Sequence, residues 1–462
     1  MNFPGRFVFL LQQCVQSARF SVNINGTLKG WFGSTRGLRQ GDPISSYMFI
    51  IVLEVFNGLM REASQSAGFS FHHQCQLQQI TQISFADDMV IVVSPTQQSI
   101  QLMQQCLDEF GQITGLKLNC AKSKIYFGSV NTVERGRICR LLSMEEGCLP
   151  MKYLGVPLSS GHLTCEDYRG LTDRICSKIN SWQARHLSFG GRAQLVRSSI
   201  FGLQNFWCAN LPITRYVIQE VEQLIRTFLW AGKGDGEYHA KVAWKTLCLP
   251  LKEGRLGFKC MITWSQVCLG KLMWNIASLK QTLWVQWVHS VRLKGGSVWA
   301  YRKRDRDPWY WNKILKVRPL VRHRLQVSVG NGSTVSFWHD PWCELGPVCD
   351  YLDAGERASL QVPSGAKLSE VEWVMPGARR QTIRVLQVRD CFVKLVFSGE
   401  KDQWRWGAGE FVQRQLWEDV RVRGTTVGWG RWLWSCYGIP RYAFIVWLLL
   451  QNRLSTKDRL CR

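Results

Sequence analysis

The adjacent carboxylates of Asp87 and Asp88 are the side chains of this chain best suited to chemistry. They lie between Gln82–Phe85 and the apolar run Met89–Val93, so the pattern predicts a β-hairpin with both acids at its tip. Adjacent carboxylates disfavour each other's ionisation unless a cation neutralises them. In two-metal sites, ions about 3.5–4 Å apart hold the attacking and leaving oxygens of a phosphoryl transfer. An Asp-Asp pair alone is more often a solvated turn than a metal site. The flanking elements are therefore needed to choose between the two interpretations.

A capped helix is expected before the hairpin. Asp42 is a good N-cap and Pro43 suits the first helical position, and apolar residues from Ile44 to Leu59 predict a broad buried face. The basic, glycine-containing loop Arg36–Gly41 leads into this helix. Such a loop at a helix N-terminus can hold a phosphate or a nucleotide. An ordinary capped helix is the alternative. Further upstream, the sequence predicts a helix over 5–18 and a hairpin that turns at Asn25-Gly26.

A second helix is expected over 97–114, ended by Gly115. Lys122 and Lys124 follow it, just before a predicted strand at 125–127, and could reach the phosphates of a nucleotide held at the acidic tip. Solvated surface lysines are the alternative. Helix, acidic hairpin and helix together predict a small α+β layer.

The distribution of charge suggests a polyanionic partner. The formal net charge is +24, of which residues 251–462 carry +17, and 17 of the 22 tryptophans also follow residue 250. Residues 292–324 hold 11 basic and 2 acidic groups among aromatic residues, namely Trp299, Tyr301, Trp309, Tyr310 and Trp311. Basic groups neutralise phosphate and aromatic rings stack on unpaired bases, which predicts nucleic-acid contact. A solvated basic face over core tryptophans is the alternative.

The remaining segments are assigned more coarsely. Residues 164–229 are predicted to be helical with a turn at Gly190-Gly191, and 327–338 to form a hairpin around Gly330–Gly332. Residues 340–435 are expected to be irregular, with no assigned function. The apolar helix expected at 443–450 is predicted to dock on a segment outside this chain.

The 17 cysteines occur singly, without a C-x-x-C motif, which favours a reducing compartment. His339, Cys343 and Cys349 form a weak zinc candidate that lacks a fourth ligand. Phe7–Leu11 is too short to span a bilayer and no other segment is expected to do so. The sequence therefore predicts a soluble, intracellular protein of the nucleus or cytoplasm, with no signal peptide and no membrane partner.

Together, these motifs resemble the reverse transcriptases of plant LINE-like (non-LTR) retrotransposons. The resemblance rests first on Arg36–Pro43, Phe85–Asp88, Gly115–Lys124 and Tyr153–Leu158, in this order and at this spacing. It continues through five later motifs and so covers nearly the whole chain: Leu187–Arg192, Gly254–Gly257, Gly330–Trp338, Pro440–Leu448 and Arg453–Arg459.

The resemblance implies an α+β fold: a partial palm over 1–160 with a sheet and packed helices, then a thumb-like helical region over 161–250. A basic, Trp-rich nucleic-acid-binding region would follow over 251–435. Residues 436–462 would begin a zinc-binding-type region that lacks its ligand cluster. Both ends would be truncated relative to the family.

The resemblance also implies roles for single residues. Asp87 and Asp88 would be catalytic and bind Mg²⁺ (or Mn²⁺), and Lys122 would protonate the pyrophosphate leaving group. Five residues would contact the nucleotide or template: Arg39, Gln40, Gly41, Phe85 and Lys124. The primer grip would comprise Tyr153, Leu154 and Gly155. The partners would be an RNA template, a DNA primer and deoxynucleoside triphosphates.

One departure from the family is important. The family has another metal-binding aspartate upstream of the basic loop, but this chain has no aspartate before Asp42, which caps a helix. The expected function is an RNA-directed DNA polymerase fragment that is weakly active or inactive. A non-catalytic nucleic-acid-binding remnant of the same element is the alternative. An intron-encoded maturase fits the Trp-rich motifs less well.

Overall fold

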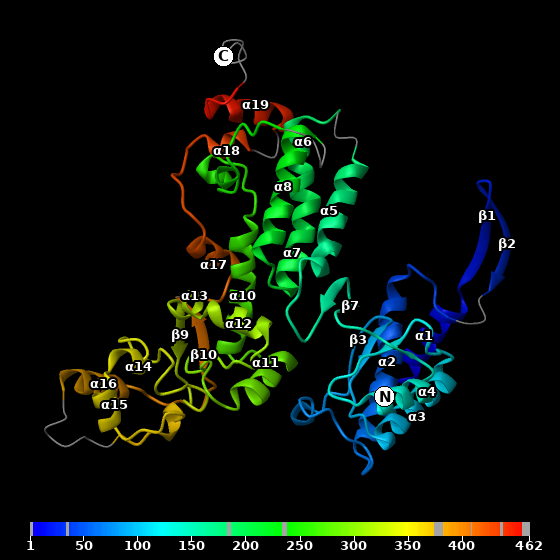
Figure 1. Cartoon of the computed structure of the whole chain (residues 1–462), viewed down its shortest axis with the longest axis horizontal. Coiled ribbons are helices and arrows are strands. Elements are labelled where there is room, and N and C mark those ends of the chain that lie inside the picture. The colour runs from blue at the N-terminus through cyan, green and yellow to red at the C-terminus, as the bar shows by residue number, and fades with distance from the viewer. Residues whose placement is uncertain are drawn as a thin grey trace. The chain divides into compact units, whose positions relative to one another are not determined.

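A computed structural model describes residues 3–33, 37–182, 186–232, 238–373, 382–407, 409–434 and 438–454. The chain divides into two compact units, Met1–Cys148 and Leu149–Arg462, and each is described by itself (Figure 1). Arg36 and the last residues from 455 on lie outside the described part.

The first unit begins with α1 (Gly5–Gln16), β1 (Arg19–Ile24) and β2 (Thr27–Gly33), close to the predicted ranges. β1 and β2 pair antiparallel around Asn25 and Gly26, whose φ angles are +49° and +81°. Left-handed backbone at both turn residues matches the twist of the strands, which explains the Asn-Gly pair. The predicted hairpin is confirmed.

Helices α2 (Pro43–Ser64) and α3 (Gln97–Thr114) form the core of the first unit. Asp42 caps α2 by accepting a hydrogen bond from the Ile44 amide at 3.1 Å, and Gly115 ends α3 in the left-handed conformation. Phe56 packs edge-on against Phe110, with ring centroids 5.3 Å apart. Both helices are confirmed.

The broad buried face predicted for α2 is only partly correct. Its fully buried residues are Phe56, Met60 and Ala63, in the second half of the helix. Tyr47 in the first half is 70% exposed, whereas the fully packed positions of α2 lie from Phe56 on. By length and composition α2 could also cross a membrane, with a mean hydropathy of 1.5. No such helix was expected from the sequence, and α2 meets the requirement by length and composition alone.

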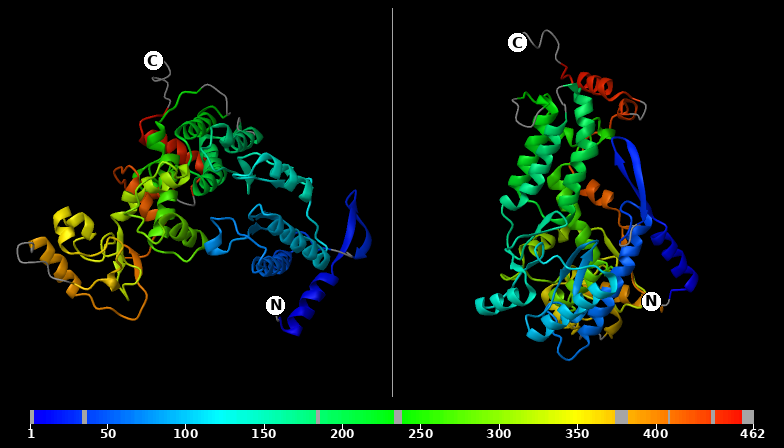
Figure 2. Two further views of the ribbon diagram at one scale, coloured as in Figure 1. Left: turned by 60° about the horizontal axis from the view of Figure 1, so that its bottom comes forward. Right: turned by 90° about the vertical axis from the view of Figure 1, so that its right-hand side faces the viewer.

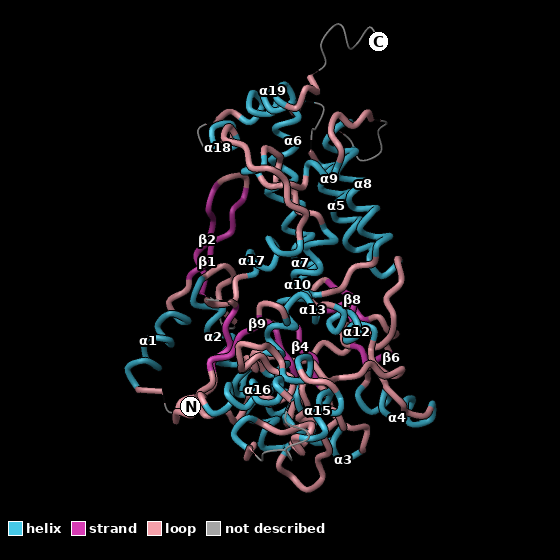
Figure 3. Tube along the Cα trace, turned by 90° about the vertical axis from the view of Figure 1, so that its left-hand side faces the viewer, coloured by secondary structure: helices cyan, strands magenta, loops and turns pink. Residues whose placement is uncertain are grey.

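Short strands complete the first unit. β3 (Gln82–Phe85) pairs antiparallel with β4 (Asp88–Ile91), and β5 (Lys124–Ile125) pairs in parallel with β6 (Glu145–Glu146) across α4 (Thr132–Leu142). Every sheet in the described residues has two strands, and Figure 3 shows how short the strands are beside the helices. The unit is thus the expected α+β layer, but with isolated ribbons instead of one continuous sheet.

The second unit opens with a hairpin, β7 (Met151–Tyr153) and β8 (Val156–Leu158). A helical bundle follows, made of α5 (Arg169–Ser181), α6 (Phe189–Leu195), α7 (Phe201–Asn210) and α8 (Arg215–Ala231). A short π-helix (Val196–Ile200) joins α6 to α7. Figure 2 shows the bundle helices side by side, and their core includes Tyr168, Trp207 and Phe228. The predicted helical character of 164–229 is confirmed.

Two predictions about this bundle were wrong. Gly190 and Gly191 lie inside α6 and form no turn, because Ser188 caps the helix immediately before them. The terminal helix α19 (Pro440–Leu450) docks on this chain's own α6, with the rings of Phe444 and Phe189 stacked 5.7 Å apart. Gly190 permits the contact, since a Cβ there would overlap the carbonyl of Pro440.

A second core surrounds α10 (Met261–Ala277), on which several short elements pack. These are α11 (Leu283–Trp287), α12 (Trp309–Lys316), α13 (Arg318–Arg322), β9 (Leu325–Ser328), β10 (Gln403–Trp406) and α17 (Gln413–Val420). Two short helices, α9 (Trp244–Leu247) and α18 (Gly430–Leu433), pack in the bundle core.

The region expected to be irregular carries its own small core. Phe337, Trp338 and Trp342 pack with α14 (Val348–Tyr351), α15 (Ala354–Ser359) and α16 (Ile383–Val393). The hairpin predicted at 327–338 is wrong, because β9 pairs with the distant β10. The Gly330–Thr334 loop instead wraps around the carboxylate of Asp402, which accepts hydrogen bonds from the amides of Gly330, Gly332 and Thr334.

Candidate metal and nucleic-acid site

The acidic hairpin has a two-residue turn. Phe85 pairs with Asp88 across the ribbon, so Ala86 and Asp87 alone form the tip. Ala86 takes a φ of +49°, a left-handed conformation that costs a residue with a Cβ about 1–2 kcal/mol. Both aspartates are exposed, and the ring of Phe85 is 62% exposed beside them. The predicted hairpin is confirmed, and it holds both carboxylates in solvent.

Helices α2 and α3 position the hairpin from behind. Met89 and Ile91 of β4 pack against the cluster that contains Phe56 and Ile100. The side-chain amide of Gln82 also donates a hydrogen bond to Asn57 of α2. The strands are therefore anchored on one side, while the tip projects away from the core.

The two carboxylates fit a divalent cation in part. Mg²⁺ usually binds to one or two carboxylates together with water and substrate phosphates, so Asp87 and Asp88 suit one such ion. A two-ion site needs further carboxylates. Across the described ranges, no three His, Cys, Asp or Glu side chains come together in a group that could hold a metal. Within the described ranges, the hairpin therefore offers donors for one such ion and not the larger donor set that two ions need.

The basic loop lies at the start of α2. Gly41 has a φ of +85°, and the carbonyl of Arg39 accepts a hydrogen bond from the Ser45 hydroxyl at 2.7 Å. Arg39, Gln40 and Gly41 are all exposed. In the described part of the chain, no hydrogen bond or ion pair joins this loop to the acidic hairpin. Both are instead attached to α2: the loop leads into its N-terminus, and the hairpin contacts it through Gln82 and Asn57.

Lys122 and Lys124 are exposed at the start of β5. The amide of Lys122 donates to the Asn119 side chain at 3.2 Å, within a turn that follows α3. Tyr153, Leu154 and Gly155 form the β7–β8 turn, where Leu154 and Gly155 have φ angles of +49° and +83°. This turn belongs to the second unit, whereas both lysines belong to the first.

The aromatic residues of the basic tract divide into two groups. Trp299 and Trp311 are buried in the second core, so the prediction that they stack on bases is wrong for these two. Trp311 faces inward with Ile314 and Leu315 because the three share one face of α12. Trp309, Tyr301 and Tyr310 are only half-buried.

The zinc candidate is also wrong. The thiol of Cys343 donates to the Gly346 carbonyl at 3.4 Å, whereas the thiol of Cys349 donates to Asp350 at 3.4 Å. Burial lowers the pKa of His339, with a further contribution from the charge of Arg322. No metal-binding group includes these residues within the described ranges.

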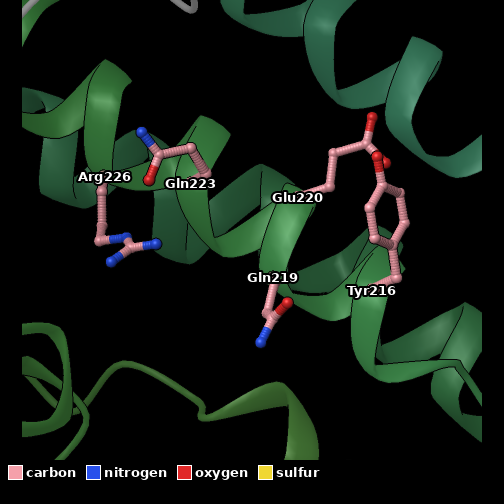
Figure 4. Close-up of a pocket in the computed structure, with 5 residues that line it drawn as sticks. All are labelled: Tyr216, Gln219, Glu220, Gln223 and Arg226. Carbon is pink, nitrogen blue, oxygen red and sulfur yellow. The ribbon is translucent and has the colours of Figure 1, made fainter.

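The structure also shows an exposed groove on α8 that none of the sequence motifs predicted. It encloses about 450 Å³ and is lined by a polar face of one helix (Figure 4), namely Tyr216, Gln219, Glu220, Gln223 and Arg226. The repeat of these residues at helical spacing predicts an exposed face. It does not predict a hollow.

The first unit combines an α+β layer with an exposed acidic hairpin. Comparison with known proteins finds two family matches in the chain. Residues 1–158 match the family described as reverse transcriptase (RNA-dependent DNA polymerase). Residues 411–462 match a second family, described as zinc-binding in reverse transcriptase. These two matches identify reverse transcriptase domains in the chain and are consistent with a non-LTR retrotransposon origin.

Three relatives support this assignment. A protein from Arabidopsis thaliana, named as a ribonuclease H protein, is 23% identical over 66% of this chain and 51% of its own length. The 149 kDa protein of transposon TX1 from Xenopus laevis is 26% identical over 56% of this chain and 19% of its own. The Pol polyprotein of the Drosophila melanogaster type-2 retrotransposable element R2DM is 29% identical over 26% of this chain and 10% of its own length. The chain thus spans about half or less of each relative.

Proposed function

We propose that this chain carries the palm and thumb of an RNA-directed DNA polymerase that extends a DNA primer on an RNA template. The observation that carries the proposal is the exposed pair Asp87 and Asp88 at a hairpin tip inside the reverse transcriptase match. A divalent cation, Mg²⁺ or Mn²⁺, would neutralise phosphate oxygens there and lower the charge barrier to nucleotidyl transfer.

The other predicted residues receive roles around this pair. Arg39, Gln40 and Gly41 would border the incoming deoxynucleoside triphosphate at the N-terminus of α2, where the helix dipole favours an anion. Lys122 would donate a proton to the leaving pyrophosphate, and Lys124 would contact the same phosphates. These lysines are exposed, which suits a ligand that carries its own negative charge.

We assign the palm to residues 1–160, the thumb to 161–250, and a basic nucleic-acid-binding region to 251–435. The α5–α8 bundle supports the thumb assignment, because it is a separate helical core that follows the β7–β8 turn. In this assignment the turn of Tyr153, Leu154 and Gly155 would hold the primer end. Residues 436–462 would continue the zinc-binding-type region, whose family match already begins at residue 411.

A second function is favoured by the incomplete donor set. With two carboxylates in place of a larger group, this chain alone would hold nucleic acid but extend a primer poorly. A loss of about 4 kcal/mol in transition-state stabilisation would slow extension roughly a thousandfold. We therefore expect strong binding of primed RNA with weak or absent extension.

Primer extension by the purified chain tests this expectation. A labelled DNA primer annealed to RNA is incubated with Mg²⁺ and deoxynucleotides, and product length is read on a gel. We expect binding without lengthened product. Extension at the rate of a complete polymerase, abolished by Asp87→Asn, would overturn the binding-only function and leave the polymerase assignment standing.

Metal binding provides a readout that does not depend on activity. Mn²⁺ binding followed by electron paramagnetic resonance should weaken in the Asp87→Asn/Asp88→Asn double variant. Asp108 and Glu109, an exposed adjacent pair on α3, provide the matched control as Asp108→Asn/Glu109→Gln. Equal Mn²⁺ affinity in the two double variants would refute the metal role of the hairpin.

A further inference from the structure

Two segments of the second unit bring aromatic and basic side chains together around Trp309. The ring of His162, from the loop before α5, lies 5.3 Å from the ring of Trp309 at an interplanar angle of 53°. On the same helix as Trp309, the Lys313 ammonium lies 5.4 Å from its ring centroid. His162 is exposed and Trp309 half-buried, so the ring pair borders solvent.

Two further cations surround Lys313. Burial lowers the pKa of Lys313, and the positive charges of Lys316 and Arg215 lower it further. Arg215 is the first residue of α8, so a third element adds charge to the same place. No ion pair among the described residues includes Arg215, Lys313 or Lys316. The charges of Lys316 and Arg215 therefore disfavour the charged form of Lys313.

The chain leading into α12 adds four exposed basic side chains. Arg302, Lys303, Arg304 and Arg306 are exposed. Asp307 is engaged within the loop, where it accepts from the Tyr301 hydroxyl at 2.7 Å and from the Arg304 amide at 2.8 Å. This acid fixes the loop that displays the basic side chains.

The chemistry that suits this patch is a phosphate chain with unpaired bases. Clustered cations relieve their repulsion when they neutralise phosphates. Aromatic rings beside them can stack on bases, which a duplex keeps paired and hidden. An acidic protein surface would neutralise the cations but would make no use of the exposed ring pair of His162 and Trp309.

We propose that Arg215, Lys313 and Lys316, with the ring pair of His162 and Trp309, form a binding site for single-stranded RNA. The site rests on the proposed function for the identity of the strand, because an RNA template is unpaired beyond the primer duplex. It differs from the acidic hairpin in residues, in structural unit and in chemistry.

Fluorescence anisotropy with labelled, unstructured oligouridine and the full chain tests the site. The triple variant Arg215→Gln/Lys313→Gln/Lys316→Gln should bind about tenfold more weakly at moderate salt. The plot of log affinity against log salt should also become shallower by about two, given a slope near −0.7 per phosphate contact for single strands. The matched control Lys271→Gln/Lys280→Gln/Lys394→Gln removes three exposed cations elsewhere in the same unit and should change affinity less than about threefold.

Stacking is tested separately. His162→Ala should weaken oligouridine binding by about tenfold and leave binding of a fully paired RNA duplex unchanged. Equal losses on single strand and duplex would overturn the stacking part of the site. Circular dichroism checks that each variant is folded, and Lys316→Gln, at an exposed position, replaces the triple variant if that variant unfolds.

The proposal fails if the triple variant binds oligouridine as tightly as the matched control does. It also fails if the wild-type chain does not bind oligouridine. Neither outcome bears on the Mn²⁺ and primer-extension tests of the acidic hairpin, because those tests use different residues. Conversely, the hairpin tests could fail while the triple variant still loses affinity for oligouridine. In that case the single-stranded RNA site would stand.

Discussion

The guanidinium of Arg421 lies 2.6 Å from the carboxylate of Glu253, and the two side chains are only 7% and 3% exposed. The same carboxylate accepts a hydrogen bond from the Gly424 amide at 2.9 Å, while Glu418 lies 2.5 Å from Arg421. The pair joins residues 168 positions apart in the sequence. The ion pair therefore connects residues 411–462, which match the zinc-binding family, to the segment that follows the helical bundle.

Breaking this pair should cost more than breaking an exposed one. Arg421→Met leaves Glu253 buried without its cation, so the free energy of unfolding should fall by about 3 kcal/mol. Arg423→Met is the control, because Arg423 is 69% exposed and lies 3.8 Å from Asp419. Its effect should stay within about 0.5 kcal/mol. Urea denaturation measures the free energy of unfolding of both variants. Equal losses would show that the buried pair stabilises the fold no more than the exposed pair does.

Adding one methyl group at Gly190 should destabilise the chain. In Gly190→Ala the new Cβ would overlap the Pro440 carbonyl, so α6 and α19 must separate, at a cost of about 1–3 kcal/mol. Gly202→Ala, in α7, meets no atom within 4 Å and should instead stabilise by about 0.5–1 kcal/mol. Thermal unfolding compares the two variants. The same sign of change in both would contradict the close approach of α19.

Stability should fall as Asp340 ionises. Burial raises the pKa of Asp340 to about 6, although it accepts hydrogen bonds from Trp299 and Ser336. A carboxyl group with a raised folded-state pKa stabilises the fold fully below its unfolded pKa, and this contribution is lost as pH rises through about 6. The difference amounts to about 3 kcal/mol. Asp340→Asn should flatten the dependence of the urea midpoint between about pH 4 and pH 7. An unchanged slope in the variant would refute the assignment.

Asp402 should have the opposite pH dependence. Although burial alone would raise its pKa, hydrogen bonds from Thr334, Gly330 and Gly332 lower the pKa below the usual value for Asp. A lowered folded-state pKa stabilises the fold above the unfolded pKa, and this contribution is lost as pH falls through the folded value. Asp402→Asn should therefore lower stability at neutral pH and weaken the acid-side slope. The exposed Asp305→Asn is the control, and a slope change as large there would contradict the role of the loop.

Features set by neighbouring residues could be predicted from the sequence. The Asn25-Gly26 turn, the Asp42 cap, the Gly115 stop and the acidic hairpin each depend on contacts within a few residues. Local conformational preference and hydrogen bonding determine such features wherever the segment lies in the fold. The same locality explains why the reverse transcriptase motifs could be found in order along the chain.

Features set by distant residues could not be predicted in this way. Alternating apolar residues predicted that 327–338 contains strand, but β9 takes its partner from 403–406. Composition suggested that Trp299 and Trp311 could stack on bases, but packing against α10 buries both. A periodic pattern shows which residues share a face and leaves open what that face meets.

The sequence by itself determined the family motifs, the positive charge and the acidic hairpin that the site requires. The tertiary structure alone decided that α19 docks on α6, that Asp402 organises the Gly330–Thr334 loop, and that His162 lies beside Trp309. The physical reason is that each of these contacts joins segments far apart in the chain. Such contacts form only when burial of apolar surface compensates for the conformational entropy lost in closing long loops.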